Sequence, residues 1–136
     1  MDVKFHIDHP RCNDSMIGHC DEWIPIAPRT DAALIAALTY VMIKEDLLVR
    51  TFLDKYTIGF SENTLPQDAV KNSSYESYAL RLSDGIEKTP DWAIKITKIP
   101  ARRIVQLARE IATIKPCFIE QGWGVQRHSN GMNRVK

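Results

Sequence analysis

The sequence contains few cysteines and no excess of either charge, and both shortages exclude classes of protein. Its 136 residues include three cysteines, Cys12, Cys20 and Cys117, which are too few and too unevenly spaced for a disulfide framework, so we expect reduced thiols. The 18 basic and 17 acidic residues give a formal net charge of +1. That balance gives no reason to expect nucleic acid or an anionic membrane surface as a partner.

A long apolar run and a signal sequence are also missing. The longest nearly apolar run, Ala32–Ile43, is interrupted by Thr39 and Tyr40 and is too short for a membrane span. The first residues lack the basic region, the apolar stretch and the cleavage site of a secretory signal. A composition with 44% hydrophobic and 26% charged residues is typical of globular proteins, and the length suits one domain over residues 1–136.

Alternating and apolar segments predict three strands. Residues Val3–Asp8 alternate between apolar and polar side chains and stop before Pro10, and Trp23–Ile26 forms the second predicted strand. Cys117–Glu120 follows a predicted helix, and such a helix-to-strand crossover is typical of parallel sheets. The sequence therefore predicts an α/β fold, a Rossmann-like layered sandwich in which helices flank a short, mostly parallel sheet.

Two predicted helices have the clearest apolar faces. The first runs from Asp31 to about Lys44, and the second begins after Pro100. The residues expected to be buried are Leu34, Leu38, Val41 and Met42 in the first helix and Ile104, Leu107, Ala108, Ile111 and Ala112 in the second. The opposite face of the second helix, which we expect to be solvated, consists of Arg102, Arg103, Gln106 and Arg109.

Shorter helices are predicted between these two. Leu47–Tyr56 forms one of them, with Asp46 as its cap, and Tyr75–Leu82 contributes one or two further turns. Thr89 caps another helix, which begins at the proline that follows it. Residues 61–74 are rich in turn-forming side chains and show little periodicity, so a loop is expected there.

A strand, a proline turn and a helix start follow one another in the stretch Trp23–Leu34. We expect Thr30 or Asp31 to cap the helix, so that unpaired N–H groups of its first turn face the space beyond the strand end. Such an arrangement binds anions and the polar edges of nucleotides. The alternative is an ordinary strand-to-helix connection with a capping residue.

A second candidate site, residues 121–128, directly follows the predicted third strand. Two glycines flank Trp123 and allow close approach of a ligand, while Gln126–His128 supply donors for a phosphate or for a pterin or purine edge. The segment does not match a dinucleotide fingerprint, because no third glycine and helix follow. The alternative is a turn in which Trp123 fills the core.

Parallel strands would bring three strand ends to one edge of the sheet. Asp8 ends the first strand, residues 28–31 follow the second and residues 122–126 follow the third. At such an edge Asp8 or Asp31 can accept hydrogen bonds from the amino and ring N–H groups of guanine, and Arg29 can bind phosphate.

Zinc binding and nucleophilic catalysis are the alternative kinds of chemistry. The possible zinc ligands are His6, His9, Cys12, His19 and Cys20. No pair among them has the C-x2-C or H-x3-H spacing of a structural zinc site. Ser15 and Ser129 lack the flanking glycines of a nucleophile turn, and Cys117 lies in an apolar segment where its thiol should be inert.

Five motifs occur in an order that resembles a known family. They are Ile7–Arg11, Trp23–Leu34, Lys88–Ala93, Ile99–Ala101 and Gln121–His128. Together they resemble the dimethyl sulfoxide reductase family of molybdopterin oxidoreductases over nearly the whole chain. The match is most similar to the catalytic A subunit of the dimethyl sulfoxide or selenate reductase branch, and the last motif is the most specific.

The resemblance implies an internal part of a longer enzyme that holds a bis(molybdopterin guanine dinucleotide) molybdenum cofactor. The residues that the resemblance assigns to contact with the dinucleotide are Asp8, Pro10, Thr30, Asp31, Gly122, Trp123 and Gln126. The implied reaction is oxygen-atom transfer. The implied partners are the remaining domains of the parent chain and an iron–sulfur electron-transfer subunit, in an enzyme that is periplasmic or held at a membrane by its partners.

The sequence departs from the family pattern at three positions. His9 is inserted in the first motif, Arg29 replaces the usual glycine and Val125 replaces a proline. If that glycine adopts a positive φ, the arginine costs about 1 kcal/mol or more. The sequence contains no cysteine cluster for an iron–sulfur centre and no identifiable molybdenum ligand, so we expect neither reductase activity nor a stably bound cofactor from these residues alone. The alternative is a non-catalytic binding or interaction module that self-associates through exposed apolar surface.

Overall fold

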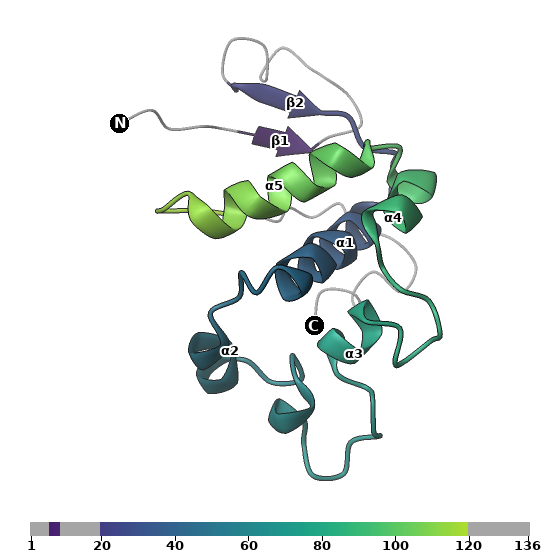
Figure 1. Cartoon of the computed structure of the whole chain (residues 1–136), viewed down its shortest axis with the longest axis vertical. Helices are drawn as coiled ribbons and strands as arrows, with labels where there is room; N and C mark the ends of the chain where they lie inside the picture. Colours follow the sequence, from purple (N-terminus) through teal and green to yellow (C-terminus); the bar gives the residue numbers. More distant parts are fainter. Residues whose placement is uncertain (1–5, 9–19, 120–136) are drawn as a thin grey trace.

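The computed structural model describes residues 6–8 and 20–119, in which short strands precede a series of helices (Figure 1). The elements in order are β1 (His6–Asp8), β2 (Glu22–Ile24), α1 (Asp31–Lys44), α2 (Arg50–Tyr56), a 3₁₀ turn (Glu62–Thr64), α3 (Tyr75–Ala79), α4 (Pro90–Thr97) and α5 (Ala101–Thr113). The helix α5 lies beside β2, to which Arg103 joins it, and α1 packs against α3, α4 and α5. Among the described residues, no helix is long and apolar enough to cross a membrane.

The strands β1 and β2 form a parallel pair, as the sequence predicted. His6 lies opposite Glu22 and Asp8 lies opposite Ile24, so the carboxyl ends of both strands meet at one edge. The strand β2 begins one residue before the predicted Trp23 and ends before Pro25, because proline has no N–H group to donate to a neighbouring strand. The described residues therefore contain a parallel strand pair with helices, and the Rossmann-like layered sandwich stays a prediction.

The prediction of a third strand is wrong for residues 117–119. These residues adopt no strand, and the side chains of Phe118 and Ile119 are 88% and 68% exposed. An apolar segment has a tendency to form a strand, but a strand also needs a neighbour with which to pair, and these residues pair with none of the described strands. Glu120 lies outside the described residues.

The apolar faces of α1 and α5 form the core together with β2 and α4. The helix α1 has the predicted bounds, and its buried Ala36 and Ala37 have so little bulk that neighbouring helices can approach closely. Leu34 and Val41 are buried on the same helix. The main core cluster consists of Ile24, Ile26, Leu34, Ala37, Ala93, Ile99, Ile104 and Leu107, with Leu38, Trp92 and Ile111 packed against it.

The helix α4 begins and ends at residues suited to those positions. The Thr89 hydroxyl accepts a hydrogen bond from the N–H of Trp92 at 3.1 Å, and Pro90 occupies the first helical position, so the predicted cap is confirmed. Lys98 ends the helix in the left-handed conformation, with φ 68°. The helix α5 follows directly and buries Ile104, as the periodicity predicted.

The helix α2 differs from its prediction in extent and burial. It begins at Arg50 instead of Leu47, and Val49 precedes its first residue in place of the predicted cap Asp46, whose φ is 53°. None of its residues is buried, and Phe52 and Tyr56 are 56% and 63% exposed although their rings lie 4.8 Å apart. The described residues therefore do not bury the two aromatic rings of this helix.

The segment between α2 and α4 contains two polar anchors that periodicity could not reveal. The Glu62 carboxylate accepts hydrogen bonds from the N–H groups of Asn72 and Ser74 and from the Ser77 hydroxyl. Hydrogen bonding to the side chains of Ser74 and Ser77 is the main cause that lowers the pKa of Glu62 to about 2. Lys88 is buried, and its Nζ lies 2.6 Å from Asp84 Oδ2 and 4.3 Å from the centre of the Tyr78 ring. The hydrogen bond from Lys88 is the main cause that lowers the pKa of Asp84.

Candidate functional site

The turn between β2 and α1, residues 27–31, is held in place by hydrogen bonds on both sides of Ala27. The Ala27 N–H donates to the carbonyl of Thr97 at 2.9 Å, and the Ala27 carbonyl accepts from the Thr30 hydroxyl at 2.6 Å. Because both backbone groups of one residue are engaged, the turn has a defined position relative to α4. We call residues 27–31 the strand-end turn.

Thr30 precedes α1 as predicted, but its side chain does not cap the helix. Its hydroxyl donates back to the Ala27 carbonyl, and it accepts no hydrogen bond from the first turn. The N–H groups of Ala33 and Leu34 reach the Thr30 carbonyl instead, whereas no acceptor for the N–H groups of Asp31 and Ala32 is found within residues 20–119. In the described part of the chain, the first turn of α1 therefore has the predicted unpaired N–H groups, but the Thr30 side chain does not cap it.

Arg29 and Asp31 give the strand-end turn its charged groups. Arg29 is exposed, and Asp31 is half-buried as the first residue of α1. A carboxylate can accept the two N–H groups of a guanine edge, and a guanidinium can bind phosphate through paired hydrogen bonds. This set of donors and acceptors fits a guanine nucleotide.

Of the predicted site residues, the structure describes three. Asp8 is the last residue of β1 and lies opposite Ile24, the last residue of β2. It is therefore at the same, carboxyl end of the strand pair as the turn that carries Thr30 and Asp31. The remaining candidates, Pro10, Gly122, Trp123 and Gln126, lie outside the described residues, as do the inserted His9 and Val125. The dinucleotide assignment of all seven residues stays a prediction.

The zinc alternative gains no support from the described residues. His9, Cys12 and His19 lie outside them, and Cys20 is partly buried. Within the part of the chain that the structure describes, no group of three or more histidine, cysteine, aspartate or glutamate side chains comes together as a metal site.

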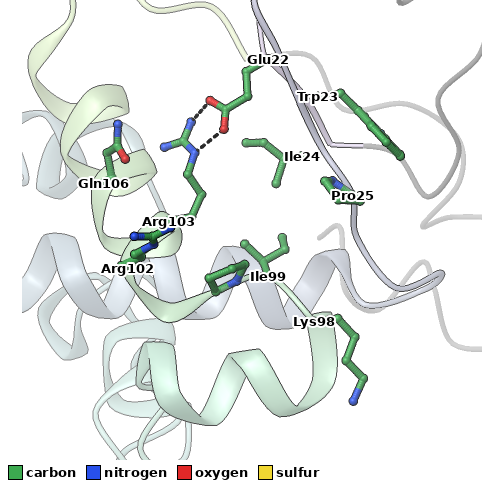
Figure 2. Close-up of a pocket in the computed structure, with 10 residues that line it drawn as sticks. Glu22, Trp23, Ile24, Pro25, Lys98, Ile99, Arg102, Arg103 and Gln106 are labelled. Carbon is green, nitrogen blue, oxygen red and sulfur yellow. Dashed lines mark hydrogen bonds and ion pairs between the residues drawn. The ribbon is translucent and has the colours of Figure 1, made fainter.

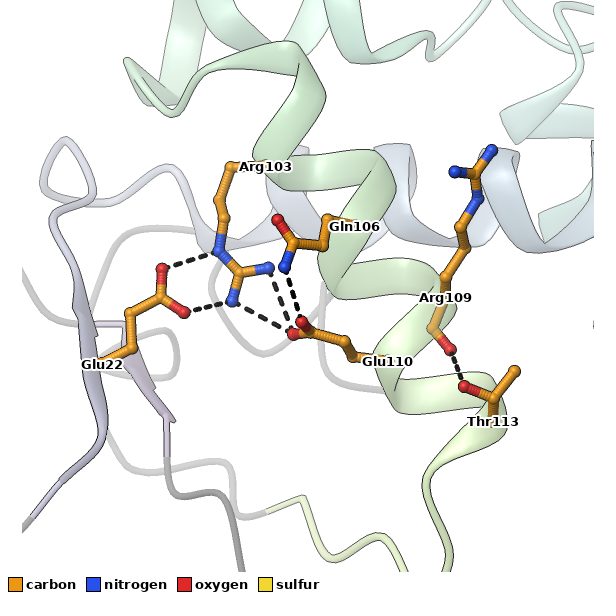
Figure 3. Close-up of polar contacts among 6 residues, drawn as sticks. All are labelled: Glu22, Arg103, Gln106, Arg109, Glu110 and Thr113. Carbon is orange, nitrogen blue, oxygen red and sulfur yellow. Dashed lines mark hydrogen bonds and ion pairs between the residues drawn. The ribbon is translucent and has the colours of Figure 1, made fainter.

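Arg103 joins α5 to β2, and the sequence did not reveal this role. Its guanidinium makes a paired contact with the Glu22 carboxylate and also lies 3.2 Å from Glu110 (Figure 3). Only 13% of the Arg103 side chain is exposed, so the expectation of a solvated residue is wrong here. The hydrogen bond to Glu22 is the main cause that raises the pKa of Arg103. The only indication in the sequence was that Arg103 lies next to the apolar face of its helix. Its partner Glu22 lies 81 residues away, so helical spacing could not reveal the contact.

A second ion pair fastens the other end of α5 to α1. Arg109 donates to both oxygens of Glu45, each at 2.8 Å, at the C-terminal end of α1. Both partners lie near the surface, and the hydrogen bond from Arg109 is the main cause that lowers the pKa of Glu45. The neighbouring Arg102 and Gln106 are exposed, as the sequence predicted.

An open pocket of about 610 Å³ lies between β2 and the start of α5, and sequence reasoning did not find it. Figure 2 shows Glu22 and Arg103 directed toward each other at one end and Lys98 at the other. Its lining residues are Glu22, Trp23, Ile24, Pro25, Lys98, Ile99, Pro100, Arg102, Arg103 and Gln106. The pocket therefore reaches Pro25, next to the strand-end turn, but Asp31 is not among the residues that line it.

Arg29 adopts the strained conformation that its glycine-like position predicts. Its φ is 68°, where a side chain costs about 1 kcal/mol relative to glycine. We expect Arg29→Gly to raise the free energy of unfolding by about 0.5–1 kcal/mol in urea denaturation. Arg102→Gly in α5 is the matched control and should lower it by about 1 kcal/mol. A loss of stability in both variants would contradict this expectation.

Comparison with known proteins places the sequence in a family. No model of a protein family matches the sequence, but individual proteins do. It is 61% identical over 130 residues to the dimethyl sulfoxide reductase DmsA of Haemophilus influenzae and 56% identical over 130 residues to DmsA of Escherichia coli; each match covers 95% of this chain and 16% of the relative. The chain corresponds to one segment of a molybdopterin oxidoreductase of the dimethyl sulfoxide reductase family. The resemblance seen in the five motifs is therefore confirmed, and the chain spans 16% of the length of these family members.

The fold is also found in a solved structure. The acetylene hydratase of Pelobacter acetylenicus superposes with a TM-score of 0.70 at 23% sequence identity, over 97% of this chain and 16% of that one. At this identity the likeness shows the fold alone.

Proposed function

We propose that this chain supplies part of the guanine dinucleotide site of a bis(molybdopterin guanine dinucleotide) cofactor in a longer reductase of the dimethyl sulfoxide or selenate type. The observation that supports it most is the strand-end turn. In a chain that belongs to this reductase family, the turn presents Asp31, Arg29 and the first N–H groups of α1 beside the carboxyl end of β1. Open parallel sheets bind nucleotides at such an edge.

Each group in the turn has a distinct task in this proposal. The Asp31 carboxylate accepts hydrogen bonds from the amino and ring N–H groups of guanine, and Arg29 meets a phosphate. The hydrogen bond of Thr30 to Ala27 keeps both in place. Asp8, Pro10, Gly122, Trp123 and Gln126 complete the contact surface.

The longer enzyme provides what this segment lacks. Further strands extend the β1–β2 pair into a Rossmann-like layered sandwich, and the remaining domains enclose the cofactor. Bound molybdenum supplies oxygen-atom transfer from an S-oxide or oxyanion, and an iron–sulfur subunit delivers the electrons. The residues of this chain bind and orient the nucleotide end of the cofactor.

Titration of the chain with GDP by calorimetry tests this function. We expect saturable binding that Asp31→Ala weakens about 10-fold or more, because it removes hydrogen bonds to a charged acceptor. Asp91→Ala is the matched control, since Asp91 is also an acid in the first turn of a helix, α4, and its replacement should leave affinity unchanged. ADP should bind more weakly than GDP, because its adenine edge lacks the two donors for Asp31.

Three outcomes would contradict the proposed function. They are the absence of saturable binding at millimolar GDP, equal affinity for ADP, and an equal loss of affinity in the Asp31 and Asp91 variants.

A further inference from the structure

The C-terminal end of α4 is tied to the chain that follows it through one buried hydroxyl. Thr97 is fully buried, and its Oγ1 donates to the carbonyl of Ala93 at 2.9 Å. The same oxygen accepts from the N–H of Ile99 at 3.2 Å, and Ile99 is 1% exposed. The hydroxyl therefore satisfies a buried N–H group at the point where the backbone leaves α4 through the left-handed residue Lys98.

The backbone carbonyl of the same residue holds the strand-end turn. The Ala27 N–H donates to the Thr97 carbonyl at 2.9 Å, across 70 positions of sequence, and the Ala27 carbonyl accepts from Thr30. A continuous series of hydrogen bonds thus runs from Ile99 and Ala93 through Thr97 to Ala27 and Thr30. The next residue in the chain is Asp31, the proposed acceptor for guanine.

We propose that Thr97 is a positioning residue for the nucleotide site, which it affects through the strand-end turn without touching the nucleotide. This inference rests on the proposed function. Removing the hydroxyl leaves the buried N–H of Ile99 without its acceptor, so the last turn of α4 shifts or frays. The Thr97 carbonyl then no longer fixes Ala27, and Asp31 loses its defined position relative to β1.

The chain offers close control residues for this proposal. Thr97→Val keeps the shape of the side chain and removes the hydroxyl, whereas Thr97→Ser keeps the hydroxyl. Thr113 makes the same kind of hydrogen bond, from its hydroxyl to the carbonyl of Arg109 at 2.7 Å, near the exposed end of α5 (Figure 3). Thr113→Val therefore removes an equivalent helical bond away from the turn.

Two measurements on these variants separate positioning from general stability. Hydrogen exchange at the Ala27 amide should become about 5-fold faster or more in Thr97→Val, and the dissociation constant for GDP should rise about 5-fold or more. Thr97→Ser should restore both to within about twofold, and Thr113→Val should change neither. Exchange is compared at equal stability, in urea adjusted for each variant, so that global unfolding does not account for the difference.

Several results would overturn the proposal. They are unchanged Ala27 exchange in Thr97→Val, a failure of Thr97→Ser to restore it, or an equal effect of Thr113→Val. If Thr97→Val does not fold, hydrogen exchange in the unmodified chain is measured instead. The protection factors of the Ala27 and Ile99 amides should then agree to within about threefold. A larger difference contradicts the proposal. An absence of GDP binding in the unmodified chain rejects the proposed function, while Ala27 exchange still tests the role of Thr97.

Discussion

Replacing Ile104 with alanine is expected to lower the free energy of unfolding by about 3 kcal/mol. Ile104 is fully buried in α5 and belongs to the cluster that joins β2, α1 and α4, so the truncation leaves a cavity in the centre of the core. The loss includes the hydrophobic transfer of the missing carbons and the contacts that the cavity wall no longer makes. Urea denaturation followed by circular dichroism measures it.

Ile35 gives the matched control for this substitution. It lies on α1 and is 41% exposed, so Ile35→Ala should change stability by less than about 1 kcal/mol. Equal losses in the two variants would mean that the cluster around Ile104 is not the core of the protein.

Arg103→Met is expected to lower the free energy of unfolding by about 2 kcal/mol. The substitution keeps much of the apolar stem but leaves Glu22 and Glu110 without their shared cation. The expected loss is smaller than for a fully buried pair, because 38% of the Glu22 side chain remains in contact with solvent. Urea denaturation at low ionic strength is the appropriate measurement.

Two further variants test the cause of that loss. Arg102→Met removes the neighbouring, exposed guanidinium and should have little effect on stability. Glu22→Gln combined with Arg103→Met should recover part of the loss, because the negative charge that Arg103 contacts is removed together with the arginine. A double variant no more stable than Arg103→Met alone would contradict a direct interaction between the two residues.

The helices were predictable where local chemistry determines them. In α4 a threonine cap, a proline and an apolar anchor stand next to one another in the sequence, and the structure places Thr89 and Trp92 as those signals indicate. In α1 the recurrence of apolar residues from Leu34 to Val41 identified the buried face. Such signals act within one or two turns of the chain, so a single sequence contains all of the information they need.

Features that depend on distant partners could not be predicted in this way. Residues 117–119 have the apolar character of a strand, yet strand formation requires another strand beside them. The burial of Arg103 depends on Glu22, and the role of Thr97 depends on Ala27; each partner belongs to another element. Spacing within the sequence gives no measure of such contacts.

The candidate site was predicted in part. Local pattern placed Asp31 at the start of α1, but it suggested a capping role that the Thr30 side chain does not have. The family resemblance, in which a glycine is usual at position 29, raised the possibility of the positive φ that Arg29 adopts. A hydroxyl can both donate and accept, so local pattern alone does not show that the Thr30 hydroxyl donates to the Ala27 carbonyl.

The central claim is that the strand-end turn receives the guanine nucleotide, and a nitrogen–proton NMR spectrum recorded during GDP addition tests it most directly. We expect the largest shifts at the backbone amides of residues 29–34, with saturation at the same GDP concentration as in calorimetry. The same spectra of Asp31→Ala should show these shifts strongly reduced. Saturable shifts at Arg102, Arg103 and Gln106, which line the open pocket, without shifts at residues 29–34, would contradict the claim.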